Sequence, residues 1–511
     1  MDLVIADLQV RRNILENGIS NTVVSASAGA GKTTIMIEKI KFVLELEQTH
    51  KTIAAITFTI KATNEIRERL GNIKVNKEIV VSTNDNFVES EIIRPFLTDT
   101  SFGKNMNDDF IIEYSGDIRN YAEGIEKLKL ENILGSYRSN LRKNFKFELA
   151  KNILLESIAA RQYLVSKYTM LFLDEYQDSD SEMHDLFMYI KNELNIKLFI
   201  VGDEKQAIYI WRGAHRNIFN ILNQEDFERY ILTHNFRCHP EITNFANLVH
   251  HPEYYNATEE LVSNMILCKT ELTPDVCLQN LILNGELDIN KEITVLINVN
   301  LTAERFAQDL KDLGYDFIFI PKTPIDEGLL NAFLLRQLAN LYFDPYFSIY
   351  DFCEALKIDN EPKQIKTYEK LFRPLIDKEE INYEKIKILC EKFAEKFEFS
   401  ISDEEIAKLT ETIMNPAFEI CFVRNESKLK IMTVFGSKGL EFDQVVAFGR
   451  EYNLYDQERR NNHYVAITRA KDKMIMIDNT FRYKQELAEI FVEQGVKTGD
   501  EAKKIIRVIT I

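Results

Sequence analysis

Short apolar runs alternate with amphipathic stretches over the first 240 residues of the chain. Continuous apolar runs of this length predict strands buried on both faces, and a 3.6-residue periodicity predicts helices at 35–46 and 61–70. The expected strands are 22–24, 51–59, 168–173 and 197–201. Strands that alternate with helices predict an α/β fold with a parallel sheet.

A second series of the same kind follows, with a helix at 302–313. Its expected strands are 293–299, 315–320, 429–434, 443–448 and 473–477. Residues 321–428 interrupt this series and are mostly helical in pattern, and a smaller, mostly helical insert spans 88–160. We therefore expect two sheet domains, 1–87 with 161–245 and 246–320 with 429–511, and two inserts, 88–160 and 321–428.

Composition indicates a soluble globular protein of two to four domains. The chain has 511 residues, of which 45% are apolar and 28% charged. No apolar run approaches the ~18 residues of a membrane span, and the first residues do not resemble a signal peptide. Six cysteines without a CxxC pair indicate reduced thiols. These features predict a cytoplasmic protein that does not act at a membrane.

The net charge of −17 taken alone argues against nucleic-acid binding, although a local basic track would suffice. One candidate track lies within 127–151, where cations alternate with aromatic rings that suit a single strand. Its members are Lys127, Lys129, Arg138, Arg142, Lys143 and Lys146, with Tyr137, Phe145 and Phe147. A solvated helix face with core aromatics explains the same pattern equally well.

The stretch SASAGAGKTT at 25–34 predicts a phosphate-binding loop between the strand at 22–24 and the helix at 35–46. Glycines allow backbone N–H groups to surround phosphates at the positive end of a helix. The expected ATP contacts are Ala28, Gly29, Ala30, Gly31, Lys32, Thr33 and Thr34. Lys32 would reach the β- and γ-phosphates, and the Thr33 hydroxyl would ligate Mg²⁺. A glycine-rich helix cap without a ligand is the disfavoured alternative.

Two further strand ends carry groups that suit phosphoryl transfer. Asp174 and Glu175 follow the strand at 168–173, where open α/β sheets bind ligands. Asp174 could hold Mg²⁺, and Glu175 could deprotonate the attacking water. After the strand at 197–201, Gln206 could sense the γ-phosphate, and Trp211 in the same loop could stack on a base. A single tryptophan is otherwise more often a core residue.

With these residues in order, the chain resembles the UvrD/Rep/PcrA DNA helicases of superfamily 1A from about residue 9 to residue 471. The matching segments are 55–70, 174–179, 201–214, 233–237, 431–443 and 464–470. The resemblance implies two RecA-like P-loop motor domains, each built on a parallel sheet. It also implies that the helical insert at 321–428 is a shortened form of a mobile subdomain.

The resemblance assigns nucleotide roles to matched residues. Gln9 would read adenine, Phe236 would stack on it, and Glu441 would meet the ribose. Arg237 and Arg469 would act as arginine fingers from opposite sides of a cleft. For each arginine, a surface ion pair is the alternative.

The resemblance also assigns DNA contacts, with Phe58 and Trp211 gripping the strand alternately. The implied DNA-binding residues are Phe58, Thr59, Lys61, Trp211 and Thr433. In the fifth motif Phe435 replaces the usual histidine, which puts one backbone contact in doubt. The aromatic-tipped hairpin that splits duplexes in relatives has no clear match, although Phe481 or Tyr483 could serve.

These features predict an ATP- and Mg²⁺-dependent DNA translocase or helicase on single-stranded and junction DNA, with 3′ to 5′ polarity implied by the resemblance. The alternative is a nucleotide-gated DNA sensor that activates a partner nuclease, because small UvrD-like subunits of anti-phage systems, such as the Gabija helicase subunit, have a similar build. A small-molecule kinase is nearly excluded, since it would need neither Trp211 nor two distal arginine motifs.

Overall fold

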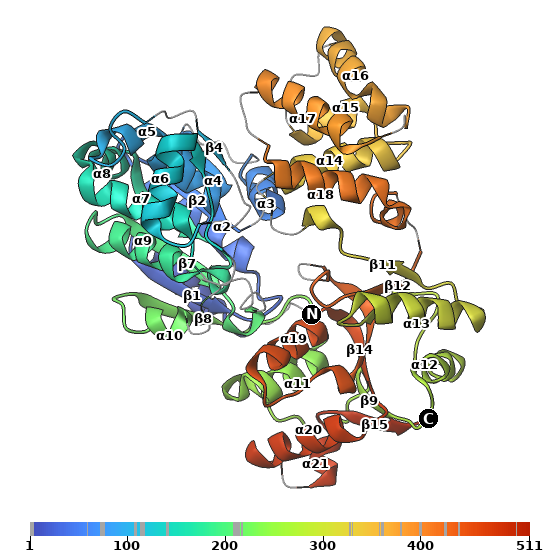
Figure 1. The fold of residues 1–511 in the computed structure, drawn as a ribbon. Coiled ribbons are helices and arrows are strands. Elements are labelled where there is room, and N and C mark those ends of the chain that lie inside the picture. Colours follow the sequence, from blue (N-terminus) through green and yellow to red (C-terminus); the bar gives the residue numbers. More distant parts are fainter. Residues whose placement is uncertain are drawn as a thin grey trace.

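The computed structural model places two parallel sheets beside each other and a separate group of helices above them (Figure 1). It describes residues 5–58, 60–71, 77–106, 110–112, 118–138, 143–207, 215, 218–326, 329, 331–356, 358, 362–378, 381–397, 401–423, 427–437, 440–496 and 498–511. None of the helices in these ranges combines the length and apolar character that crossing a bilayer requires.

The first sheet has six parallel strands in the order β3-β2-β6-β7-β1-β8. Its strands are β1 (Thr22–Ala26), β2 (Thr52–Thr57), β3 (Val80–Thr83), β6 (Tyr168–Leu173), β7 (Lys197–Gly202) and β8 (Glu228–Leu232). Successive residues point to opposite faces, so Val23 and Val24 enter two different cores. Helices α1 (Leu8–Glu16), α2 (Lys32–Leu46) and α3 (Ile60–Gly71) cover one face.

The second sheet has seven parallel strands in the order β11-β12-β10-β13-β14-β9-β15. Its strands are β9 (Met265–Lys269), β10 (Ile293–Leu296), β11 (Ile318–Ile320), β12 (Leu429–Met432), β13 (Phe442–Phe448), β14 (Ala470–Asp478) and β15 (Arg507–Thr510). Helices α11 (Pro240–His250), α19 (Gln457–Ile467) and α20 (Arg482–Glu493) pack on one face, and α12 (Pro274–Leu283) and α13 (Asn300–Asp312) pack on the other. The predicted α/β fold with two parallel sheets is confirmed.

Four strands of these sheets were not predicted, namely β3, β8, β9 and β15. Three of them (β3, β8 and β15) are edge strands. The edge strand β8 exposes Glu228, Arg229 and Ile231, so it lacks the continuous apolar run of a central strand. The predicted strand at 293–299 ends earlier, at Leu296, because the chain turns there toward α13.

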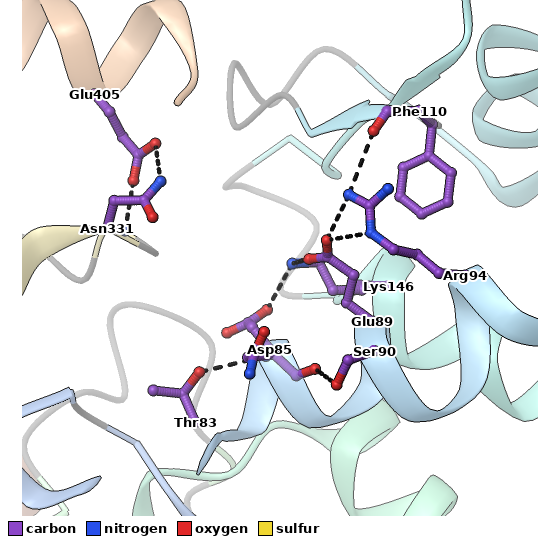
Figure 2. Close-up of polar contacts among 10 residues, drawn as sticks. Thr83, Asp85, Glu89, Ser90, Arg94, Phe110, Lys146, Asn331 and Glu405 are labelled. Carbon is purple, nitrogen blue, oxygen red and sulfur yellow. Dashed lines mark hydrogen bonds and ion pairs between the residues drawn. The ribbon is translucent and has the colours of Figure 1, made fainter. Parts of the chain in front are cut away.

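Residues 321–428 form a helical group with a core of its own. Its helices are α14 (Ala332–Phe343), α15 (Ile349–Leu356), α16 (Pro362–Ile376), α17 (Tyr383–Phe397) and α18 (Asp403–Met414). A capping box of Ser402 and Glu405 starts α18. The Glu405 carboxylate also accepts the backbone and side-chain N–H groups of Asn331, at 2.7 and 2.9 Å, which fastens the start of α14 to α18 (Figure 2).

Residues 88–160 share their core with the first sheet. The segment contains a π-helical turn (Glu89–Ile93), α5 (Arg94–Phe96), α6 (Tyr121–Glu131) and α7 (Phe145–Glu156), and also two short strands, β4 (Ile111–Ile112) and β5 (Ile133–Leu134). The helix α8 (Ile158–Lys167) then leads into β6.

The prediction that aromatic rings of the candidate basic track within 127–151 stack on a single strand is wrong. Tyr137, Phe145 and Phe147 are at most 6% exposed and belong to the core. Lys146 is also buried, and its ammonium lies 3.2 Å from Asp85 and 3.9 Å from Glu89 (Figure 2). Arg142 lies outside the described residues. The pattern therefore reflects core aromatics beside a solvated face, the other interpretation that the sequence allowed.

Candidate active site

The loop between β1 and α2 has the backbone geometry of a phosphate cradle. Gly29 and Gly31 adopt left-handed φ values of +73° and +77°, which side chains rarely tolerate. A Cβ on Gly29 would lie 2.5 Å from Oδ1 of Asn235, so this position also has no room for a side chain. Lys32 and Thr33 begin α2 half-buried, and Thr34 is exposed and accepts from Arg69 at 3.3 Å. The first turn of α2 thus presents backbone N–H groups of the kind that bind phosphate.

Two neighbouring carboxylates lie at the end of β6. Asp174 is 5% exposed, and its Oδ1 accepts the backbone N–H of Glu175 at 2.9 Å. Glu175 has a left-handed φ of +49°, a strained conformation of the kind that concentrates at functional sites. Burial and the Glu175 charge raise the pKa of Asp174, while Lys32 opposes the shift. A buried carboxylate beside a second one is poorly stabilised as an anion, so this pair fits a divalent cation.

A chain of hydrogen bonds joins Glu175 to the loop after β7. The Gln177 amide donates to the Glu175 carboxylate, and its Oε1 accepts the backbone N–H of Asp203 at 3.0 Å. Asp203 Oδ2 accepts from Nε2 of Gln206 at 2.7 Å. The predicted base and the predicted γ-phosphate sensor therefore belong to one network, through two residues that the sequence did not single out.

The segment after β8 closes over the phosphate loop. Asn235 donates through Nδ2 to the Ala28 carbonyl at 2.8 Å, and the Phe236 N–H donates to the Gly29 carbonyl at 2.9 Å. Arg237 then points toward the second sheet, where its Nε lies 2.6 Å from Oε2 of Glu441. The carboxylate predicted to bind ribose and a predicted arginine finger thus form an ion pair between the two sheets.

An exposed aromatic surface lies beside the phosphate loop. Phe236 is 50% exposed, and the guanidinium of Arg11 lies 5.0 Å from its ring centroid. Arg11 also donates to the Ala30 carbonyl at 2.8 Å and pairs with Asp7 at 2.7 Å. Gln9 is exposed on α1 and donates to Asn13 at 2.9 Å. Arg11 was not predicted, because nothing in its local sequence indicates its partners.

Arg469 reaches the same region from the second sheet. It follows α19, is 1% exposed, and donates to the carbonyls of Val465 at 3.1 Å and Leu440 at 3.0 Å. Burial and the positive charge of Arg237 lower its pKa to about 10, and Glu175 opposes the shift. Two mutually repelling guanidinium groups beside a helix N-terminus make a site that an anion would stabilise.

The predicted DNA contacts are only partly described. Phe58 follows β2 and packs half-buried against the first core. Thr433 follows β12, is buried, and accepts the Gly436 N–H at 3.0 Å. Lys61 lies in α3, and Thr59 and Trp211 lie outside the described residues. Tyr483 is fully buried, so it cannot be the duplex-splitting aromatic, whereas Phe481 is 41% exposed.

Comparisons with known proteins agree with this geometry. The chain matches the family model of an AAA domain over residues 12–212 and that of the UvrD-like helicase C-terminal domain over residues 428–477. It is 42% identical to the Gabija protein GajB of Bacillus cereus over 501 residues, which are 95% of this chain and 98% of the relative.

Two helicases resemble a smaller part of the chain. The ATP-dependent DNA helicase Rep of Buchnera aphidicola is 27% identical over 304 residues, 50% of this chain and 46% of the relative. The ATP-dependent DNA helicase PcrA of Staphylococcus epidermidis is 25% identical over 274 residues, 44% of this chain and 37% of the relative. The likeness to Rep and PcrA thus spans less than half of each of those helicases.

Proposed function

Since the chain belongs to the GajB family of UvrD-like helicases and is an ATP-dependent DNA helicase, we propose that it translocates along single-stranded DNA, hydrolysing Mg²⁺-ATP between its two sheets. The convergence of Arg237 and Arg469 from different sheets beside Lys32 and Glu175 carries this proposal. A binding-only module would not need two finger arginines and a strained carboxylate at one phosphate site.

The residues have distinct roles in the proposed reaction. Lys32 and the N–H groups of the first turn of α2 hold the β- and γ-phosphates, and Gln206 contacts the γ-phosphate. Thr33 and Asp174 would hold Mg²⁺, which supplies charge neutralisation on the phosphate oxygens. Glu175 orients the attacking water and takes its proton. Arg237 and Arg469 neutralise the charge that develops on the transferred phosphoryl group.

Hydrolysis is thereby linked to the spacing of the two sheets. Arg469 directly precedes β14 of the second sheet, and its bonds to the carbonyls of Val465 and Leu440 hold it on that side of the site. Alternate closure and opening would move DNA past Phe58 and Trp211, with 3′ to 5′ polarity by analogy with the family. We place this activity on single-stranded and junction DNA in the cytoplasm.

The first test is ATPase of the purified chain with no DNA, with single-stranded DNA and with duplex DNA. Lys32→Ala should abolish turnover in all three, because it removes the phosphate cation. Lys41→Ala, which removes an exposed lysine from the same helix, is the matched control and should keep parental turnover. Turnover by Lys32→Ala equal to that of the control would refute the assignment of the phosphate loop.

The likeness to a Gabija protein over nearly its whole length supports a second candidate, a DNA-sensing subunit of an anti-phage complex that activates a partner nuclease. On this proposal, single strands would stimulate ATPase little in the isolated chain, while basal turnover would still require Lys32 and Glu175. Strong stimulation by single strands alone would favour the autonomous translocase.

A further inference from the structure

Helix α19 of the second domain contacts two loops of the first sheet through buried hydrogen bonds. The hydroxyl of Tyr464 accepts the Ala28 N–H of the phosphate loop at 3.1 Å and lies 3.3 Å from Oδ2 of Asp203. One turn earlier, Asn461 donates to the Ala207 carbonyl at 2.9 Å. Tyr464 is 1% exposed and Asn461 2%, so water does not compete for these contacts.

The direction of these bonds is determined by the groups involved. A backbone N–H can only donate, so the Tyr464 oxygen accepts from Ala28 and its proton is directed to Asp203. Burial and the Asp203 charge raise the pKa of Tyr464 well above its ordinary value, which keeps this proton on the phenol. Asp203 Oδ2 therefore accepts from both Tyr464 and Gln206, the predicted γ-phosphate sensor.

We propose that the Tyr464 hydroxyl is a positioning group that aligns α19 with the phosphate loop and with Gln206 at the same time. This inference rests on the proposed function, and it adds a residue that neither touches nucleotide nor donates charge. Arg469 is tied to the same helix through its bond to the Val465 carbonyl at 3.1 Å. The position that Tyr464 gives α19 therefore also determines where the arginine finger starts its movement.

Loss of the Tyr464 hydroxyl should affect turnover more than nucleotide binding. Removing the hydroxyl leaves the buried Ala28 N–H without this partner and takes away one of the two donors to Asp203 Oδ2, a loss that typically changes an equilibrium about tenfold. The first turn of α2 keeps its own N–H groups and Lys32, so nucleotide binding is affected less than turnover.

The test compares Tyr464→Phe with Tyr452→Phe. Tyr452 is equally buried in the same core, and within the described chain its hydroxyl has no hydrogen-bond partner, so it controls for removing a buried hydroxyl. Tyr464→Phe should lower kcat for DNA-stimulated ATPase about tenfold and change KM for ATP by less than about threefold. Tyr452→Phe should match the parent, and equal kcat in the two variants would overturn the proposal.

A double-mutant cycle separates positioning from general structural support. If Tyr464 acts through Asp203 and Gln206, Tyr464→Phe should cost much less in a Gln206→Ala background than in the parent. Fully additive losses would show that Tyr464 does not act through Gln206 and would overturn the proposal. Lys32→Ala distinguishes failure of this proposal from failure of the proposed function. An active Lys32→Ala protein would refute the phosphate site, whatever the result for Tyr464.

Discussion

Asn235 explains why Gly29 is glycine in this phosphate loop. Left-handed backbone alone would disfavour a side chain there, but Asn235 Oδ1 also occupies the space that a Cβ needs. The same oxygen accepts the N–H groups of Arg237 and Cys238, at 2.7 and 2.9 Å, so it cannot move without disturbing a predicted arginine finger. The loop is thus shaped by its protein neighbours as well as by its ligand.

Gly29→Ala should therefore destabilise the protein more than the same substitution at a left-handed glycine with free space around it. Gly18→Ala is the matched control, since Gly18 has a φ of +70° with nothing within 4 Å of its Cβ position. Left-handed strain alone costs about 1 kcal/mol, so thermal unfolding should show that loss for Gly18→Ala and a larger one for Gly29→Ala. Only Gly29→Ala should also weaken binding of an ATP analogue. Equal effects would mean that Asn235 does not restrict the loop.

Glu175→Gln tests the predicted base. The amide cannot take a proton from water, so kcat should fall by about 10²–10⁴, the usual contribution of such a group. Binding of an ATP analogue and of single-stranded DNA should persist. Glu193→Gln, at an exposed carboxylate after α9 (Ser181–Asn192), should keep full turnover. Normal turnover in Glu175→Gln would remove this residue as the base.

At the scale of elements, local pattern predicted all of the central strands except β9 and missed three of the four edge strands. The central strands are buried on both faces, so their sequences are continuous apolar runs such as that of β6. Edge strands such as β8 and β15 are partly exposed and mix polar with apolar residues, and the pairing of β15 with β9 is a long-range property that no window of residues contains. Tyr464 was missed as a contact for a similar reason, because Ala28 lies 436 residues away.

Helices α11 and α19 meet through a buried histidine pair. Nε2 of His250 lies 3.0 Å from Nδ1 of His463, whose Nε2 lies 2.5 Å from the Tyr483 hydroxyl. Burial lowers the pKa of His463 to about 3, and burial and His463 lower that of His250 well below its ordinary value. Arg460 lowers the pKa of both histidines further.

This pair predicts loss of stability in mild acid. Both histidines stay neutral in the folded protein, whereas the unfolded chain takes up protons below about pH 6.5, so the free energy of unfolding falls as pH falls. Below that pH each histidine contributes a slope of up to about 1.4 kcal/mol per pH unit. Denaturant unfolding between pH 7 and 5 should show this slope. His463→Gln removes one of the two histidines and should reduce the slope by up to about 1.4 kcal/mol per pH unit. His50→Gln, at an exposed histidine, should leave the slope unchanged. An unchanged slope in His463→Gln would contradict the prediction that His463 stays neutral in the folded protein.

At the scale of the whole molecule, the proposed active site draws residues from both sheets. The phosphate loop, the carboxylates and Gln206 belong to the first sheet, and Arg469 and Glu441 belong to the second. The ion pair of Arg237 with Glu441 and the contacts of Tyr464 join the two sides in the present arrangement.

Arg469→Ala should uncouple binding from turnover. The first sheet keeps its phosphate loop, so affinity for an ATP analogue should change little, while loss of a fully acting arginine finger lowers kcat by ~10³–10⁵. Arg459→Ala removes an exposed arginine from α19, the helix that precedes Arg469, and should leave kcat unchanged. A variant at Arg469 that turns over ATP normally would place the reaction within the first domain alone.

The strand order of the second sheet also has a consequence for biosynthesis. Among the described strands β9 pairs only with β14 and β15, so it has no neighbour in the sheet until residues 470–478 have been made, and β10 has none until residues 429–432 have been made. At ~5–20 residues per second, a ribosome takes roughly 10–40 s to travel from β9 to the end of β14. For much of that interval the nascent chain exposes the apolar strands β9 and β10, and the helices of 321–428, which have their own core, are made after β10 and before β12. The second sheet can therefore be completed only late in translation, long after every described strand of the first sheet has been made.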